Sequence, residues 1–273
     1  MTKYGAQNLL LVGCGKMGSA LYEGWKRHHP ALKITLCDPH NSGAHYHDLG
    51  DIHEQFDLCV LAVKPDQIHD VAARAHARLN PHGVLISIAA GKTLKNLEAL
   101  SHATSTGQSD MRGIVRVMPN TPAAIGHGMS VAVANDYVTG AQKDFIGTLF
   151  QSVGRFAWIE DETFMDAVTA LSGSGPAYLF YFIEALAEAG ESLGLDRALS
   201  LTLARETIFG SAHLAAQASE DAAQLRKNVT SPGGTTEAAL KVLMDENTGL
   251  APLLRQTLEA ARNRGREMGK TPS

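Results

Sequence analysis

The chain has 273 residues, a formal net charge of −4, and 44% hydrophobic against 19% charged residues. This length favours two domains of unequal size, and the composition is that of an ordinary globular protein with a sizeable core. A weakly acidic chain matches nucleic acid poorly, and no apolar run approaches the length of a membrane span. We therefore expect small-molecule partners, with no nucleic acid and no membrane.

The cysteines indicate a reducing compartment. Cys14, Cys37 and Cys59 lie in or beside apolar stretches, and their spacing is not that of metal ligands. Their odd number does not suit a disulfide framework. The first apolar strand begins near Asn8, which leaves no room for a signal segment. A cytoplasmic protein without a metal site is expected.

The first half of the chain alternates short apolar runs with helical patterns. Strands are predicted over Asn8–Val12, Lys33–Cys37, Asp57–Val63, Val84–Ala89 and Gly113–Met118. Helices are predicted between them over Lys16–His28, Pro65–Leu79 and Lys92–Leu100. Nearly continuous apolar strands are typical of a parallel sheet covered on both faces by helices, so an α/β domain with a Rossmann-type doubly wound sheet is predicted. Further elements complete this domain, residues 1–161: Met129–Ala134, Ala141–Ser152 and Arg155–Ile159.

A glycine-rich turn separates the first strand from the first helix. The residues Gly13, Cys14, Gly15, Lys16, Met17 and Gly18 spell G-x-G-x-x-G. Gly13 suits a tight turn, Gly15 lets a pyrophosphate approach the backbone, and Gly18 lets helix and strand pack closely. The start of the helix offers free N–H groups to phosphates. A purely structural turn is the alternative, but the surrounding βαβ pattern favours a dinucleotide cofactor.

Asp38 ends the second strand, twenty positions after Gly18 (38 minus 18). An acidic residue there accepts hydrogen bonds from an adenosine ribose, which favours NAD(H). The loop that follows, Pro39 to Ser42, holds donors that suit the 2′-phosphate of NADP(H), and Asp38 can instead cap the turn. These residues leave the choice between the two cofactors open.

More cofactor-binding residues are expected where the third and fifth strands end: Ala62, Val63, Lys64, Pro65, Met118 and Asn120. Strand ends on this edge of a parallel sheet line the ligand crevice. Lys64 is expected near the nicotinamide ribose or the phosphates, although a surface lysine before a proline-started helix explains it equally well. Asn120 is expected to contact the nicotinamide or its ribose.

The second half, residues 162–273, is predicted to be an all-helical domain. Helices are expected over Pro176–Leu193, Asp196–Ala218, Asp221–Lys227, Thr235–Glu246 and Leu250–Met268. The first of them is apolar nearly all round over Tyr178–Ile183, and such a helix must be buried. A dimer interface is the economical explanation, and a central core helix in a monomer is the alternative.

Two segments rich in Gly, Ser and Thr open helices of this second half. Ser172, Ser174 and Gly175 precede the long apolar helix. A later helix is opened by Ser231, Gly233, Gly234, Thr235 and Thr236. Such helix starts present several backbone donors, which suits a carboxylate. Ordinary capping explains the first segment as well, whereas the second carries more donors than a cap needs and is expected to bind a ligand.

With these segments the chain resembles the pyrroline-5-carboxylate reductase family over essentially its whole length. The runs that carry the resemblance are Gly13–Gly18, Ala62–Pro65, Arg116–Pro122, Ser172–Ala177 and Val229–Thr236. The last run is the most specific of them. The resemblance implies a Rossmann domain followed by a helical domain that interlocks with a partner subunit, in a homodimer and in some members a higher homo-oligomer.

The resemblance also implies an activity: hydride transfer from NAD(P)H to the C=N bond of 1-pyrroline-5-carboxylate, which gives L-proline in the last step of proline biosynthesis. It implies that the loop from Ser231 to Thr236 receives the substrate carboxylate. The Thr236 hydroxyl is then the expected catalytic group, hydrogen-bonded to the ring nitrogen. Asp38 departs from the family, whose members tend to carry a hydroxyl residue there. We expect NADP(H) as the cofactor, with NAD(H) as the alternative.

The chemistry fits the side chains present. A protonated cyclic imine is already an electrophile, whereas reduction of an ordinary ketone needs a proton donor. Neither Ser172–Tyr178 nor Val229–Thr236 contains His, Lys or Asp. The nearest rival is a β-hydroxyacid or imine reductase, but such dehydrogenases need a catalytic lysine near the first long helix of the second domain. A non-catalytic sensor that binds NADP is a second rival, but it leaves the Thr-rich loop unexplained.

Overall fold

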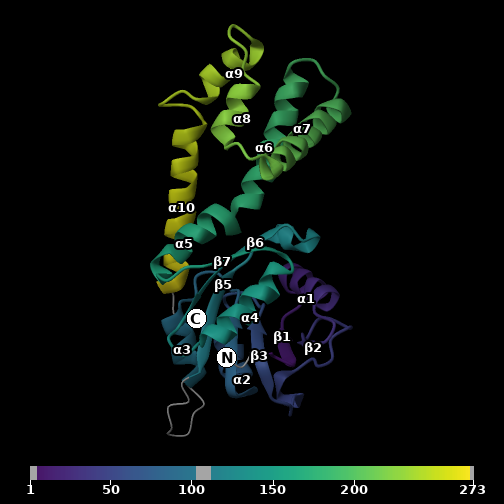
Figure 1. Cartoon of the computed structure of the whole chain (residues 1–273), viewed down its shortest axis with the longest axis vertical. Helices are drawn as coiled ribbons and strands as arrows, with labels where there is room; N and C mark the ends of the chain where they lie inside the picture. Colours follow the sequence, from purple (N-terminus) through teal and green to yellow (C-terminus); the bar gives the residue numbers. More distant parts are fainter. Residues whose placement is uncertain (1–4, 103–111, 271–273) are drawn as a thin grey trace. The chain divides into compact units, whose positions relative to one another are not determined.

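A computed structural model of the chain describes residues 5–102 and 112–270 (Figure 1). It has two compact units: the first reaches Ser174 and also includes the chain from Ala261 onward, and the second is Gly175–Ala260. The first unit extends past residue 161, because the side chains of Met165 and Ala170 are buried in it. The division into domains at residue 161 stays a prediction.

The first unit is built on one seven-stranded sheet with the order β2-β1-β3-β4-β5-β6-β7. The strands are β1 (Asn8–Val12), β2 (Lys33–Cys37), β3 (Phe56–Leu61), β4 (Leu79–Ser87), β5 (Gly113–Met118), β6 (Gly128–Ala134) and β7 (Gly154–Trp158). The first five run parallel. The predicted Rossmann-type sheet is confirmed.

The last two strands run against the first five, which the pattern of apolar runs did not predict. β6 is antiparallel to β5, and β7 is parallel to β6. Only residues 119–127 join β5 to β6, and they form the 3₁₀ helix η2 (Thr121–Ile125) and a left-handed turn at Gly126. A parallel crossover needs a dozen or more residues, so the chain must reverse.

Helices cover both faces of this sheet. They are α1 (Lys16–His28), α2 (Ile68–His76), α3 (Leu94–His102) and α4 (Gly140–Gln151). Leu9 and Leu11 of β1 share a core cluster with residues of α1 and α4, including Trp25. Leu10, between them, belongs to a second cluster with residues of α2 and α3. Because successive side chains of a strand point to opposite faces, β1 is apolar throughout.

A short helical stretch ends the first unit. It consists of η3 (Glu162–Phe164), α5 (Met165–Val168) and the π-helix η4 (Thr169–Gly173). Met165 packs with Met118, Val131 and Val133 in a third buried cluster. The sequence predicted no element here before Pro176.

The second unit is helical, as predicted. Its helices are α6 (Gly175–Ser192), α7 (Arg197–Gln217), α8 (Ala222–Asn228), α9 (Thr235–Leu243) and α10 (Leu250–Lys270), whose last turns belong to the first unit. α6 and α7 pack closely, since a Cβ on Gly190 would lie 3.0 Å from Ser200 Oγ. Within the parts of the chain that the structure describes, no helix has the length and apolarity to cross a membrane.

Candidate active site

The order of the strands brings the predicted cofactor residues together. The connection after β1 leads to β2 on one side, and the connection after β3 leads to β4 on the other, so the carboxyl ends of β1 and β3 form the switch point of the sheet. A cavity of about 740 Å³ lies there. Its lining includes eight predicted cofactor residues, namely Gly13, Cys14, Gly15, Asp38, Pro39, Ala62, Val63 and Lys64.

The structure gives a different reason for the presence of glycine at each of the three positions in the turn. Gly13 has φ +94°, and a Cβ there would lie 2.7 Å from the Ala62 carbonyl oxygen. A Cβ on Gly18 would overlap the carbonyl oxygen of Gly13, whereas one on Gly15 would meet no atom within 4 Å. The open space at Gly15 is therefore what a closely approaching ligand requires. α1 begins at Lys16 without a side-chain cap bond, so its first N–H groups suit a pyrophosphate.

Asp38 caps the loop after β2 and also contacts the glycine turn. Its Oδ1 accepts hydrogen bonds from the backbone N–H groups of His40 at 2.7 Å and Asn41 at 3.1 Å. Its Oδ2 accepts one from the N–H of Cys14 at 2.6 Å. Of the two roles considered for Asp38, the structure contains the capping geometry.

The far side of the cavity is lined by α2 and the loop before it. Lys64 is exposed there, and Arg74 of α2 pairs with Asp48. The N–H of Gly50 and the Arg74 guanidinium lower the pKa of Asp48 below its ordinary value. Arg74 was missed from the sequence. Its helical spacing from Gln67, Asp70 and Val71, which line the same cavity, was the available signal.

Asn120, at the end of β5, holds the segment that contains Ser172. Its Oδ1 accepts a hydrogen bond from the N–H of Met129 at 2.8 Å. Its Nδ2 donates to the carbonyl oxygen and to the Oγ of Ser172, each at 3.3 Å. Ser172 belongs to the π-helix η4, and a Cβ on the neighbouring Gly173 would lie 3.1 Å from the Sδ of Met118. π-helical turns are frequent at functional sites. Contact of Asn120 with the nicotinamide stays a prediction.

The Thr-rich loop of the second unit presents free backbone donors. Gly233 has φ +72°, and the N–H of Gly234 donates to the carbonyl oxygen of Ser231 at 3.0 Å. α9 has no side-chain cap, and its first intrahelical bond runs from Ala238 N–H to the Gly234 carbonyl oxygen at 3.2 Å. The N–H groups of Thr235 and Thr236 precede that bond and are open to an anion.

Glu237 fixes the shape of this loop. Its Oε2 accepts a hydrogen bond from the N–H of Gly233 at 2.7 Å. The role of Glu237 was not predicted from the sequence. A Glu in the first turn of a helix commonly reaches back to a backbone N–H before the helix, and that spacing was the available signal. The predicted substrate residues Ser172 and Ser174 belong to the first unit, and Gly175 and the loop 231–236 belong to the second.

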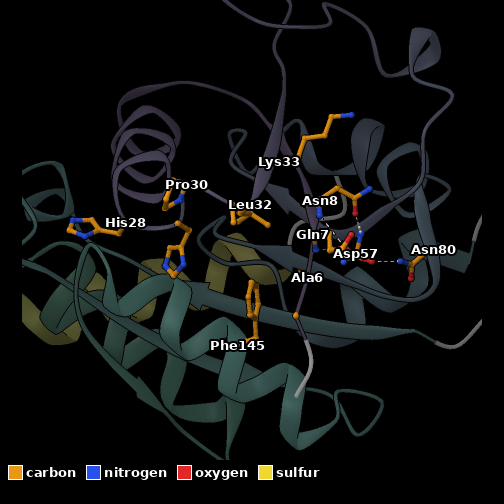
Figure 2. A pocket seen from close by; sticks show the side chains of 13 residues that line it. Ala6, Gln7, Asn8, His28, Pro30, Leu32, Lys33, Asp57, Asn80 and Phe145 are labelled. Carbon is orange, nitrogen blue, oxygen red and sulfur yellow. Dashed lines mark hydrogen bonds between the residues drawn. The ribbon is translucent and has the colours of Figure 1, made fainter. Parts of the chain in front are cut away.

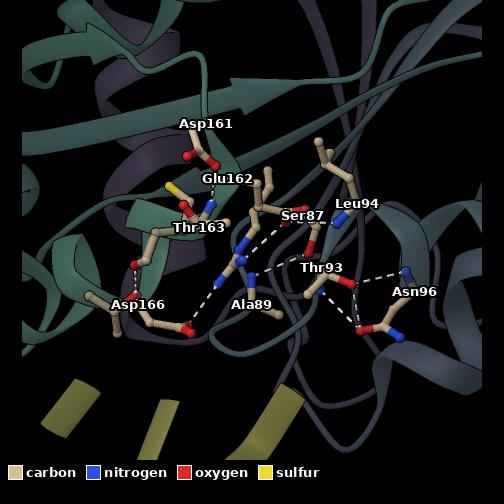
Figure 3. A network of polar contacts seen from close by, with 12 residues as sticks. Ser87, Ala89, Thr93, Leu94, Asn96, Asp161, Glu162, Thr163 and Asp166 are labelled. Atoms are coloured by element: carbon tan, nitrogen blue, oxygen red, sulfur yellow. Dashed lines mark hydrogen bonds and ion pairs between the residues drawn. The ribbon is translucent and has the colours of Figure 1, made fainter. Parts of the chain in front are cut away.

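A buried cation joins the sheet to the segment after β7 (Figure 3). Arg116 of β5 is 2% exposed, and its Nη1 donates to Glu162 Oε1 at 3.1 Å. The same Oε1 accepts the N–H of Leu94 at the start of α3, at 2.8 Å. Arg116 Nη2 lies 3.6 Å from Asp166 Oδ1. Glu162 therefore connects β5, α3 and η3.

A second cavity, of about 1100 Å³, lies at the amino-terminal ends of the strands (Figure 2). Its lining contains none of the predicted site residues. Asp57 organises one side of it by accepting hydrogen bonds from the N–H groups of Gln7 at 2.7 Å and Asn8 at 3.2 Å. Asn80 Nδ2 adds a third at 2.5 Å.

Two family models match the chain. Residues 162–268 match "Pyrroline-5-carboxylate reductase dimerisation", and residues 8–91 match "NADP oxidoreductase coenzyme F420-dependent". Among curated proteins, the pyrroline-5-carboxylate reductase of Pseudomonas aeruginosa is 37% identical, with 96% of this chain and 97% of that protein covered. The corresponding protein of Pisum sativum is 36% identical, with 94% of each covered.

Solved structures give the same picture. A pyrroline-5-carboxylate reductase from Coxiella burnetii has a TM-score of 0.85 and 34% identity, covering 98% of this chain and all of that one (100%). The pyrroline carboxylate reductase of Plasmodium falciparum, solved with NADP bound, has a TM-score of 0.82 and 32% identity, covering 97% of this chain and 100% of that one.

Proposed function

The chain belongs to the pyrroline-5-carboxylate reductase family, and from this premise we propose that it reduces the C=N bond of 1-pyrroline-5-carboxylate to give L-proline. One observation carries the proposal: curated relatives of that name are similar over both halves of the chain, not over the Rossmann half alone. A Rossmann sheet by itself is shared by many reactions, so the similarity of the helical half specifies the substrate.

The residues around the glycine turn fit a nicotinamide dinucleotide. The open space at Gly15 and the free N–H groups at the start of α1 suit its pyrophosphate. The bound cofactor supplies the hydride. NADP(H) is the proposed cofactor, supported by the NADP-bound relative and by the family model matched over residues 8–91. NAD(H) is the alternative that the sequence left open.

The substrate is proposed to bind through its carboxylate to the loop from Ser231 to Thr236. The open N–H groups of Thr235 and Thr236 and the positive end of α9 support this assignment. The Thr236 hydroxyl is proposed to hydrogen-bond the ring nitrogen and orient the imine. Ser172, Ser174 and Gly175 are proposed as the second substrate-binding segment. No general acid is required, since the imine is protonated before hydride arrives.

A homodimer in the cytoplasm is the proposed form of the protein, with a higher homo-oligomer built from dimers as an extension of it. Large apolar side chains exposed on the second unit support the dimer, among them Phe180, Tyr181 and Phe209. The family model matched over residues 162–268 describes dimerisation. The three free thiols support a reducing compartment.

The direct test adds 1-pyrroline-5-carboxylate to the protein with NADPH or NADH and follows the absorbance of the reduced cofactor. We expect rapid oxidation, with proline as the only amino acid formed. Tight binding of both cofactors without oxidation of either would contradict the proposal and favour a non-catalytic sensor.

A further inference from the structure

We propose that Asp38 is a positioning residue for the cofactor site, whose carboxylate ties the glycine turn to the loop after β2 and so serves NADPH and NADH alike. This inference rests on the proposed function, since it concerns the cofactor of that reaction. It differs from the role that an acidic residue at the end of the second strand has in many Rossmann domains, where the carboxylate accepts the ribose hydroxyls and selects NAD(H).

The contacts of Asp38 carry the inference. Its two oxygens receive three backbone N–H groups, from Cys14, His40 and Asn41. The donors come from two segments, since Cys14 lies 24 residues from Asp38 and the others lie two and three residues away. Hydrogen bonds from N–H to a carboxylate at 2.6 and 2.7 Å are short and charge-assisted, which makes them strong.

The bond to Cys14 fixes the part of the turn that a pyrophosphate would contact. Cys14 lies between Gly13, whose left-handed φ sets the turn, and Gly15, where the backbone is open. Two glycines flanking one residue make this segment intrinsically flexible. Holding its N–H in one orientation before the cofactor arrives reduces the entropy lost on binding.

The bonds to His40 and Asn41 fix the loop that lines the adenosine end of the cavity. Pro39, His40, Asn41 and Ser42 all line it, and the carbonyl oxygen of Asp38 is 3.0 Å from His47 Nδ1. Ribose hydroxyls would have to compete with three N–H groups already on the carboxylate, which has about four lone-pair positions in all. The charge of Asp38 is thus committed to the protein backbone.

Asp57, at the amino-terminal end of β3 in the same sheet, offers a matched control. Its carboxylate also accepts two backbone N–H groups, from Gln7 and Asn8, and a side-chain amide from Asn80 (Figure 2). It lies at the start of β3, whereas the cofactor cavity lies where β3 ends. Asp57→Asn therefore removes a comparable set of contacts without touching the cofactor cavity.

The experiment titrates each protein with NADPH and with NADH, with no imine present, and follows the fluorescence of the bound reduced nicotinamide. We expect Asp38→Asn to weaken both cofactors about tenfold, because its amide presents an N–H group to one of the three donors. The ratio of the two Kd values is expected to stay unchanged. Asp57→Asn is expected to lower the melting temperature and to leave both Kd values unchanged.

A second variant and a hydrogen-exchange measurement test the same inference independently. Asp38→Glu keeps the charge but moves the oxygens, so it too is expected to weaken both cofactors. In Asp38→Asn, amide hydrogen exchange at Cys14, His40 and Asn41 is expected to accelerate in the protein without cofactor. Selective loss of NADH with NADPH bound as well or better, or unchanged Kd values for both, would overturn the inference. A wild-type protein that bound neither cofactor would instead overturn the proposed function.

Discussion

At the scale of single residues, the candidate site relies on backbone N–H groups more than on acidic or basic side chains. The turn after β1 leads into α1, and the loop before α9 leads into α9. The first N–H groups of both helices lack a side-chain cap. Such donors keep the same charge state over the whole accessible pH range, unlike an imidazole or a carboxylate. We therefore expect activity to depend on the correct positioning of these groups.

Thr236 is the side chain whose loss we expect to affect the reaction most directly. Thr236→Ala removes the hydroxyl proposed to hold the ring nitrogen. Turnover at saturating substrate should fall, and the fall should correspond to a loss of about 1 to 3 kcal/mol of transition-state stabilisation. The Kd for NADPH should barely change. Thr236→Ser, which restores a hydroxyl, is expected to recover most of the turnover. Equal turnover in Thr236→Ala and wild type would remove Thr236 from the mechanism.

The rate at which the Cys14 thiol is alkylated can report cofactor binding. Cys37 and Cys59 are buried, and burial raises the pKa of both thiols, that of Cys37 to about 11. A raised pKa leaves less of the reactive thiolate at mildly alkaline pH. Half-buried Cys14 lines the cofactor cavity and should be alkylated first by iodoacetamide. Saturating NADPH should slow that modification, as measured by mass spectrometry of the labelled peptides. Equal rates of Cys14 modification with and without NADPH would place the cofactor elsewhere.

At the scale of elements, regular apolar runs were predicted well and irregular packing was not. The bounds of β1, β2, β5 and α1 agree with the prediction, because each is an apolar or amphipathic run that is followed by a Gly, Pro, Asp or polar residue. α2 ends at His76, not at Leu79, because Leu79 pairs with Phe56 at the start of β4. That pairing is a tertiary contact, which local sequence does not encode.

The same distinction holds in the candidate site. The residues in glycine-rich motifs could be predicted because turn geometry and phosphate binding restrict them to few residue types. Arg74 and Glu237 carry no such restriction, and their roles depend on what the fold places beside them. The π-helix over Thr169–Gly173 was missed for a similar reason, since no helix was predicted there and the residue types do not indicate the hydrogen bond from the Ser174 N–H to the Thr169 carbonyl oxygen.

The Arg116 network should contribute measurably to stability. Glu162→Gln keeps an acceptor for the N–H of Leu94 but removes the charge that pairs with the buried guanidinium. We expect the free energy of unfolding to fall by about 1.5 to 3 kcal/mol. Glu54→Gln, in the exposed pair with Lys33, is the control and should change it by less than about 1 kcal/mol. Urea unfolding at fixed protein concentration measures both, and equal losses would contradict a special role for Glu162.

At the scale of the whole molecule, the two units differ in how far their apolar side chains are buried. In the first unit, both faces of β1, β3 and β4 are buried under helices. In the second, Ala187 is the only buried residue of α6, while Phe180 is 58% and Tyr181 is 70% exposed. Within the second unit, α6 is therefore not a buried core helix, which supports the proposed dimer. An apolar helix with this exposure needs a partner surface.

A charge on that helix should separate the subunits. Phe180→Glu is expected to convert a dimer to monomers in light scattering at fixed concentration, because burial of an unpaired carboxylate in an apolar interface is costly. Ile125→Glu places the same charge at an exposed apolar residue of the first unit and should leave the dimer intact. Phe180→Glu with an unchanged mass would show that α6 does not form the interface.

The fate of the hydride tests the central claim most directly. The protein is supplied with NADPH in which both hydrogens at C4 of the nicotinamide are deuterium, and the proline formed from 1-pyrroline-5-carboxylate is analysed by mass spectrometry. Reduction of the C=N bond predicts one deuterium per proline, on the ring δ carbon next to nitrogen. Unlabelled proline, or deuterium at any other carbon, would contradict direct hydride transfer to the imine.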